Sequence, residues 1–110
     1  MNKVCLIGNL TRDPELRQTQ SGIAVCSFCL AVNKPKKSGA EEAEADYFRV
    51  TAWRQLGESC DKYLAKGRKC AVTGEITLEH YTDAEGLIRY QMAVTADSVE
   101  LLSPKEQSAG

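Results

Sequence analysis

Hydrophobic and polar residues alternate along most of this chain with the two-residue period of β-strands. The alternation predicts strands over residues 3–10, 23–33, 47–54, 69 to about 81 and 87–94, with a short extended piece over 15–18 and a short terminal strand over 98–102. Turn residues separate these segments at 11–14, 21–22 and 83–86, where proline, glycine, aspartate and serine occur. The pattern therefore indicates a mostly β protein.

A helical period occurs over residues 55–66. Four side chains recur there at the i, i+4, i+7, i+8 spacing of one helical face: Leu56, Cys60, Tyr63 and Leu64. Lys66 and Gly67 are typical of a helix end, because a cation suits the negative end of the helix dipole and glycine adopts the left-handed conformation easily. We therefore expect one α-helix that ends near Lys66.

Three strands, one helix and then a long hairpin form the element order of the OB-fold. We predict an all-β OB-fold, a five-stranded Greek-key barrel with one α-helix between strands 3 and 4. Residues 1–102 would supply this single domain, and residues 103–110 a disordered polar C-terminal stub without periodicity.

The strand over residues 47–54 separates two kinds of side chain. Because successive side chains on a strand point to opposite sides, Phe48, Val50 and Ala52 share one face, which is an ordinary core face. The other face holds Tyr47, Arg49, Thr51 and Trp53. Two large rings beside a guanidinium suit a flat, anionic ligand, and unpaired nucleic acid is the commonest of these. Burial of this face in an oligomer interface explains the pattern equally well.

Residues 34–44 contain proline, glycine, three lysines and three glutamates but no large apolar side chain, which predicts a hairpin loop. Two interpretations of its basic half stay open. Lys34, Lys36 and Lys37 could reach over a phosphate chain, or the charges could simply keep the loop solvated.

The charge balance alone does not favour nucleic acid. The formal net charge is −1 and the isoelectric point about 5.8, whereas nucleic-acid-binding proteins usually carry a basic excess. However, residues 1–40 contain six Lys or Arg against two Asp or Glu, and residues 41–48 contain four acids and no base. A basic surface can therefore exist on this nearly neutral chain. Without a long apolar run or a signal peptide, we expect a cytoplasmic protein with no membrane partner.

Five cysteines without a secretory signal predict reduced, buried thiols. Cys26 and Cys29 form a C-x-x-C, but positions three apart on a strand point to opposite faces. No second pair follows at ligand spacing, and the one histidine, His80, lies far along the chain. We expect no metal and no cofactor, so a thiol or metal enzyme is the weakest alternative. Because no catalytic triad, phosphate loop or carboxylate pair has a workable spacing either, we predict a protein that is not an enzyme.

Five motifs follow one another along the chain: NKV with LIGNL at residues 2–10, DPELR at 13–17, LAVN at 30–33, YLAKG at 63–67, and the turn from Asp83 to Arg89-Tyr90. In this order they resemble bacterial single-stranded DNA-binding proteins. The resemblance covers residues 1 to about 102 and is interrupted only in the loop at 34–44.

The resemblance implies an OB-fold protomer in a homotetramer that wraps single-stranded DNA without sequence choice, in DNA replication, recombination and repair at the nucleoid. It implies base stacking on Tyr47, Trp53 and Tyr81. Phosphate contacts would come from Arg17, Arg49, Lys66 and Arg89, with Lys34, Lys36 and Lys37 as loop candidates.

Some residues depart from the family pattern. Thr77 and Glu79 stand where basic residues are common, Tyr47 and Tyr81 replace tryptophans, and the loop at 34–44 lacks a tryptophan. We therefore expect weaker binding, or less DNA wrapped, than in better-known members.

The acidic tip through which family members recruit replication and repair proteins is also missing after Gly110. The chain would then be a shortened piece of a longer protein, or a short paralogue that acts on incoming DNA in natural transformation. Replication and repair proteins would be partners only if a longer tail exists. A primosome-type relative, which binds protein more than DNA, is a further alternative.

Overall fold

Strands dominate the computed structural model, which describes residues 1–34 and 44–102. In chain order its elements are β1 (Val4–Leu10), β2 (Glu15–Gln18), β3 (Ala24–Asn33), β4 (Ala45–Trp53), α1 (Arg54–Tyr63), β5 (Lys69–Thr82) and β6 (Ile88–Leu101). Within the described residues, no helix has the length and apolarity needed to cross a membrane.

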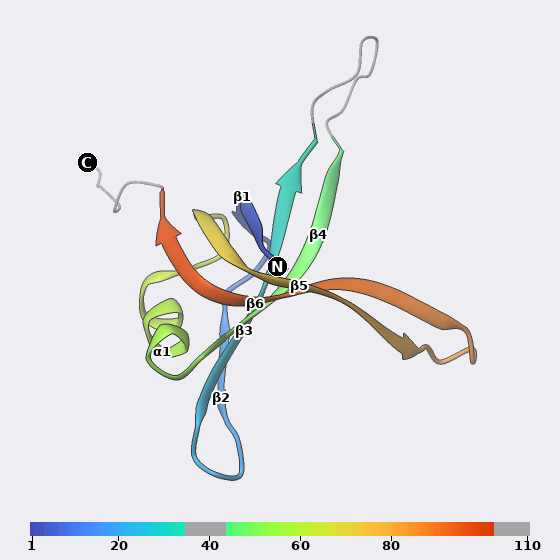
Figure 1. Cartoon of the computed structure of the whole chain (residues 1–110), viewed down its shortest axis with the longest axis horizontal. Coiled ribbons are helices and arrows are strands. Elements are labelled where there is room, and N and C mark those ends of the chain that lie inside the picture. Colours follow the sequence, from blue (N-terminus) through green and yellow to red (C-terminus); the bar gives the residue numbers. More distant parts are fainter. Residues whose placement is uncertain (35–43, 103–110) are drawn as a thin grey trace.

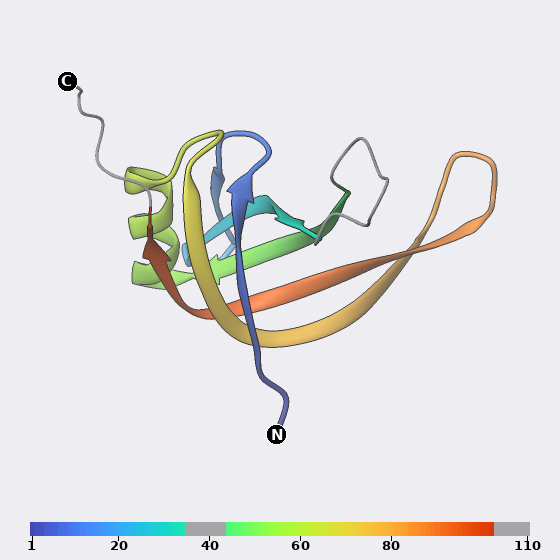
Figure 2. The same ribbon diagram turned by 90° about the horizontal axis from the view of Figure 1, so that it is seen from above.

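The strands form one curved sheet that closes on itself. Their order is β1-β5-β6-β4-β3-β2, and a further pairing of β1 with β3 closes the barrel. The pairing of β4 with β6 is parallel and the other pairings are antiparallel. Helix α1 lies at one end, and the β5–β6 hairpin projects far from it on the other side (Figures 1 and 2). The predicted all-β OB-fold with one helix is confirmed.

The described part has six strands instead of the five predicted. The extended piece over Glu15–Gln18 pairs along its whole length with β3 and counts as strand β2. Helix α1 consequently lies between β4 and β5 in the observed numbering.

Two predicted boundaries are wrong. The helix ends at Tyr63, not near Lys66, because Leu64 takes an extended backbone (φ −94°, ψ 154°) and its side chain enters the core. The two predicted C-terminal strands are the single strand β6. The pairing of β5 with β6 shifts by one residue between Thr73 and Gly74, because Thr73 pairs with Ser98 and Gly74 with Ala96. Asp97 is therefore an extra residue of β6, a bulge that breaks the alternation without ending the strand.

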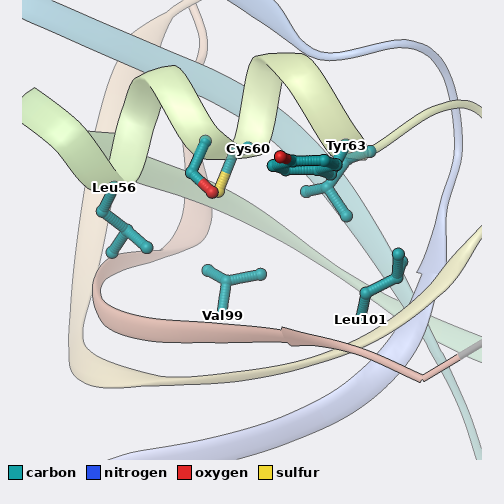
Figure 3. Close-up of a pocket in the computed structure, with 7 residues that line it drawn as sticks. Leu56, Cys60, Tyr63, Val99 and Leu101 are labelled. Carbon is teal, nitrogen blue, oxygen red and sulfur yellow. The ribbon is translucent and has the colours of Figure 1, made fainter.

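The core lies inside the barrel and under α1. Its buried members come from five strands, the helix and the residue that follows the helix: Leu6, Leu10, Cys26, Phe28, Leu30, Val50, Ala52, Cys60, Leu64, Cys70, Val72, Val94 and Ala96. The helix can approach the sheet closely because residue 57 is glycine, where a Cβ would lie 2.5 Å from the carbonyl oxygen of Ala52. Side chains of α1 face Val99 and Leu101 of β6 across a groove of about 210 Å³ (Figure 3).

The prediction that all cysteines are buried is wrong for Cys5, which is exposed on β1, and for Cys29, which is half-buried. Both stand at strand positions that point away from the core. Cys26, Cys60 and Cys70 point into it. Burial raises the pKa of Cys26 and Cys70 to about 11. Burial, reinforced by the neighbouring Cys26 and Cys70, raises the pKa of Cys60 to about 12.

We expect at most two thiols of the folded protein to react quickly with Ellman's reagent at pH 8, because only thiolates react and three thiols are buried and neutral. All five should react in denaturant. Since the folded pKa values lie above the ordinary 9.0, these thiols stabilise the fold below pH 9 and lose that contribution as pH rises toward 11. Rapid reaction of a third thiol in folded protein would contradict this account.

Candidate functional site

One outer face of the sheet carries most of the predicted site residues. The strand registers align Arg17 of β2 with Val25 of β3 and Trp53 of β4, and align Arg89 of β6 with Tyr81 of β5. Because side chains paired across strands lie on the same side of a sheet, these residues share a face. We call this surface the candidate face. Its members include Arg17, Ser27, Cys29, Tyr47, Arg49, Thr51, Trp53, Glu79, Tyr81, Arg89, Gln91 and Thr95.

Three aromatic rings on the candidate face are open to solvent. Tyr47 is 57% exposed, Trp53 43% and Tyr81 54%. Tyr47 and Trp53 stand six positions apart on β4, about 20 Å along a strand, and Tyr81 lies toward the tip of the β5–β6 hairpin. On the other side of β4, Val50 and Ala52 are completely buried, so the predicted division of this strand into two faces is confirmed.

Two adjoining hollows mark the middle of the candidate face, and both are lined by Arg17, Ser27 and Arg49. The first, of about 550 Å³, extends to Arg12, Asp13, Glu15, Cys29 and Gln91. The second, of about 370 Å³, extends to Gln18, Thr51, Trp53, Glu79 and Thr95. The hollows therefore bring guanidinium groups from two strands beside the indole of Trp53.

Exposed carboxylates accompany Arg49 and Lys34. Nη1 of Arg49 lies 3.5 Å from Oε1 of Glu79. Nζ of Lys34, at the end of β3, lies 3.5 Å from Oδ1 of Asp46 and 3.8 Å from Oε1 of Glu44. All of these side chains are partly exposed, so each ion pair is weak and open to exchange with another anion.

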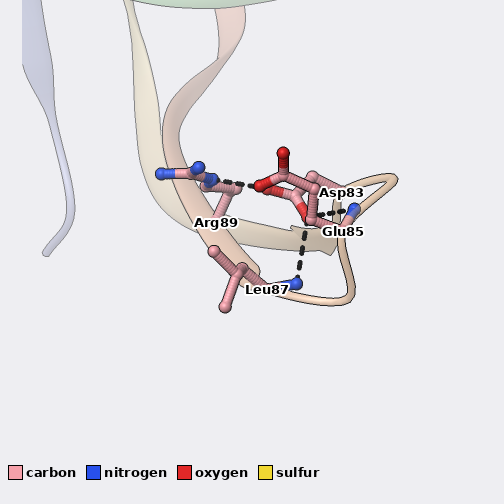
Figure 4. Close-up of polar contacts among 4 residues, drawn as sticks. All are labelled: Asp83, Glu85, Leu87 and Arg89. Carbon is pink, nitrogen blue, oxygen red and sulfur yellow. Dashed lines mark hydrogen bonds and ion pairs between the residues drawn. The ribbon is translucent and has the colours of Figure 1, made fainter.

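Arg89, near the start of β6, is hydrogen-bonded to the turn at the tip of the β5–β6 hairpin (Figure 4). Its Nε donates to Oδ2 of Asp83 at 2.8 Å, and Oδ1 of Asp83 accepts the backbone N–H groups of Glu85 and Leu87 at 2.9 Å. The hydrogen bond from Arg89, followed by those from the backbone, lowers the pKa of Asp83 below its ordinary 3.8. The network therefore holds at neutral pH and weakens only when acid protonates Asp83.

The remaining predicted basic residues lie elsewhere. Lys66 is exposed in the turn between α1 and β5, and its backbone N–H donates to Oδ1 of Asp13, which lines the first hollow. Lys66 is therefore near the rim of the candidate face and not on its strands. Lys36 and Lys37 lie outside the described residues.

The sequence did not point to Arg12 or Ser27 as site residues, although both line the first hollow. Arg12 belongs to the turn before β2, and only the pairing of β2 with β3 brings this turn to the candidate face. Ser27 has a buried Oγ that makes no hydrogen bond within residues 1–34 and 44–102. The alternation of residues 24–33 could have indicated Ser27, since its side chain points to the face opposite that of its core neighbours Cys26 and Phe28.

The C-x-x-C pair does not form a binding site. Cys26 points into the core and Cys29 lies on the candidate face, as their spacing on a strand predicts. In the part of the chain that the structure describes, no three His, Cys, Asp or Glu side chains gather as they would around a metal ion.

Comparisons with known proteins agree with the geometry. The model of the single-strand binding protein family matches residues 1–102. The chain is 42% identical to single-stranded DNA-binding protein 3 of Listeria innocua, over all of this chain and 69% of that protein. It is also 42% identical to a single-stranded DNA-binding protein of Staphylococcus aureus, over 98% of this chain and 69% of that one. A crystal structure of a small single-stranded DNA-binding protein from Streptomyces coelicolor superposes with a TM-score of 0.78 at 26% identity, covering 90% of this chain and 92% of that one.

Proposed function

Since the chain belongs to the single-strand binding protein family, we propose that residues 1–102 form a domain that binds single-stranded DNA on the candidate face without sequence choice and without catalysis. One observation carries this proposal. Three exposed rings share a face with two hollows whose common lining includes Arg17 and Arg49.

In the proposed complex the rings hold bases and the basic side chains hold phosphates. Stacking of a base on Tyr47, Trp53 or Tyr81 contributes about 1–3 kcal/mol and tolerates any base, because every base has a π-face. Arg17 and Arg49 line both hollows, so a phosphate next to a base stacked on Trp53 would lie within their reach. Arg89, Lys34 and Lys66 would contact phosphates further along the strand, and Lys36 and Lys37 would do so from the loop.

We further propose that four copies associate. Where the β5–β6 hairpin projects beyond the barrel, its core-side face exposes Leu78, Ile88, Tyr90 and Met92 to solvent. A contiguous apolar surface of this kind favours contact with another protein, and a homotetramer would cover it. Light scattering should then give four times the chain mass of 12.1 kDa, and a monomeric mass would contradict the proposal.

The same family membership supports a proposal about the cellular role. We propose that the protein coats and protects single-stranded DNA during replication, recombination and repair, in the cytoplasm at the nucleoid. Partner proteins would bind through any longer C-terminal tail of the native chain.

A fluorescence titration tests the proposed binding. Trp53 is the sole tryptophan, so stacking on it should quench the intrinsic emission when oligo-dT is added. The logarithm of the binding constant should fall linearly with the logarithm of the salt concentration, and each phosphate contact should add about −0.7 to the slope of this line. A duplex of the same length is the control and should quench little. Absence of both quenching and a rise in the anisotropy of labelled oligo-dT at low salt would refute the proposal.

A further inference from the structure

The guanidinium of Arg49 shares the candidate face with a carboxylate. Arg49 comes from β4 and Glu79 from β5, with β6 between them in the sheet, and their ion pair of 3.5 Å spans the intervening strand. Both side chains line the second hollow together with Trp53. A phosphate that enters this hollow therefore meets a negative charge beside the positive charge that would bind it.

The Arg49–Glu79 pair differs from the other arginine–carboxylate pair near this face. Asp83 is fixed by two backbone hydrogen bonds as well as by Arg89, so that pair is part of the hairpin turn. Within residues 1–34 and 44–102, Arg49 is the one polar partner of the Glu79 carboxylate. Glu79 can therefore be displaced from Arg49 without breaking a turn.

We propose that Glu79 competes with DNA phosphate for Arg49 and so lowers the affinity of the candidate face for single-stranded DNA, an inference that rests on the proposed function. Before Arg49 can neutralise a phosphate, it must exchange one anionic partner for another, and the released carboxylate stays nearby and repels the DNA. Arg12 and Arg17 form no ion pair with a carboxylate of the described residues, so they bind phosphate without this competition. Glu79 thus acts on the binding step through Arg49 and sets how much that residue contributes.

Glu79→Gln tests the proposal because it removes the charge and keeps the size of the side chain. We expect this variant to bind oligo-dT about three- to tenfold more tightly at low salt. Its salt dependence should steepen by about 0.7 in the log–log slope, the contribution of one additional phosphate contact. Glu75→Gln is the matched control, since Glu75 is exposed on the same side of β5, opposite Thr95, and is not paired with Arg49. It should change the affinity less than twofold.

A double-mutant cycle completes the test: the affinity for oligo-dT is also measured for Arg49→Gln alone and for Arg49→Gln combined with Glu79→Gln. If Glu79 acts through Arg49, the gain in affinity from Glu79→Gln should largely disappear once Arg49 is replaced. An equal gain in both backgrounds, an equal gain from Glu75→Gln, or an unchanged salt slope would overturn the proposal while single-stranded DNA binding stands. Absence of binding by the wild-type protein would overturn both. Thermal unfolding of each variant at equal concentration shows that only folded proteins are compared.

Discussion

Replacing Trp53 with alanine is expected to weaken binding of oligo-dT by about 1–3 kcal/mol, which is roughly fivefold to 150-fold in the dissociation constant. Trp53 has the largest ring on the candidate face and remains 43% exposed, so its indole is available to a base. It also lines the second hollow with Arg17 and Arg49, where a stacked base would carry its phosphate to two guanidinium groups. Because Tyr47 and Tyr81 offer smaller rings, we expect Trp53 to contribute more than either.

Anisotropy of a labelled oligo-dT at fixed salt measures this loss, since the variant has no tryptophan signal. Tyr63→Ala is the control, because Tyr63 is 49% exposed but lies on α1, away from the candidate face. Trp53→Phe should recover part of the affinity by restoring a flat ring. The side chain of Trp53 makes no capping hydrogen bond to α1, so the helix should start normally in both variants. A loss below twofold for Trp53→Ala, or an equal loss for Tyr63→Ala, would contradict the role of this ring.

The division of β4 into two faces was predictable because it depends only on local backbone geometry. Strand side chains alternate whatever the rest of the fold does, so the exposure of Tyr47 and Trp53 follows once Val50 is assigned to the core. The position of Tyr81 on the same face cannot be derived from local geometry. It depends on how β5 pairs with β6 and β6 with β4, and the sequence indicated it only through resemblance to a family.

The sequence did not predict other features that depend on long-range strand pairing, because a local pattern of residues contains no information about that pairing. Asp97 interrupts the alternation of β6, and a local pattern cannot distinguish a bulge from a strand end. The helix stops at Tyr63 because Leu64 is needed in the core, although the residues that follow form a good helix end. The ion pair of Arg49 with Glu79 joins residues thirty positions apart, and no spacing rule connects them.

Substitutions should be able to change the stability of this fold without changing DNA binding, because core side chains and binding side chains point to opposite faces of the same strands. On β3, Ser27 and Cys29 line the first hollow, while Cys26 and Leu30 are completely buried in the barrel. A change on the core side should therefore lower the free energy of unfolding without altering the chemistry that DNA meets. Leu30 gives the sharpest test, since it is completely buried and lies where β1 meets β3 to close the barrel.

We expect Leu30→Ala to reduce the free energy of unfolding by about 2–5 kcal/mol, the range for removing a buried leucine and leaving a cavity. Urea unfolding followed by circular dichroism measures the loss, at equal protein concentration because self-association would make stability concentration-dependent. Leu16→Ala removes the same atoms from a side chain that is 39% exposed on β2, and it should cost much less. At temperatures where the variant is folded, its affinity for oligo-dT should stay within about twofold of the wild type. If the lost stability were instead lost from the binding free energy, about 1.4 kcal/mol would already weaken binding tenfold. Equal destabilisation by the two substitutions would place Leu30 outside a well-packed core. A large loss of affinity in folded Leu30→Ala would show instead that the binding side of β3 depends on the packing beneath it.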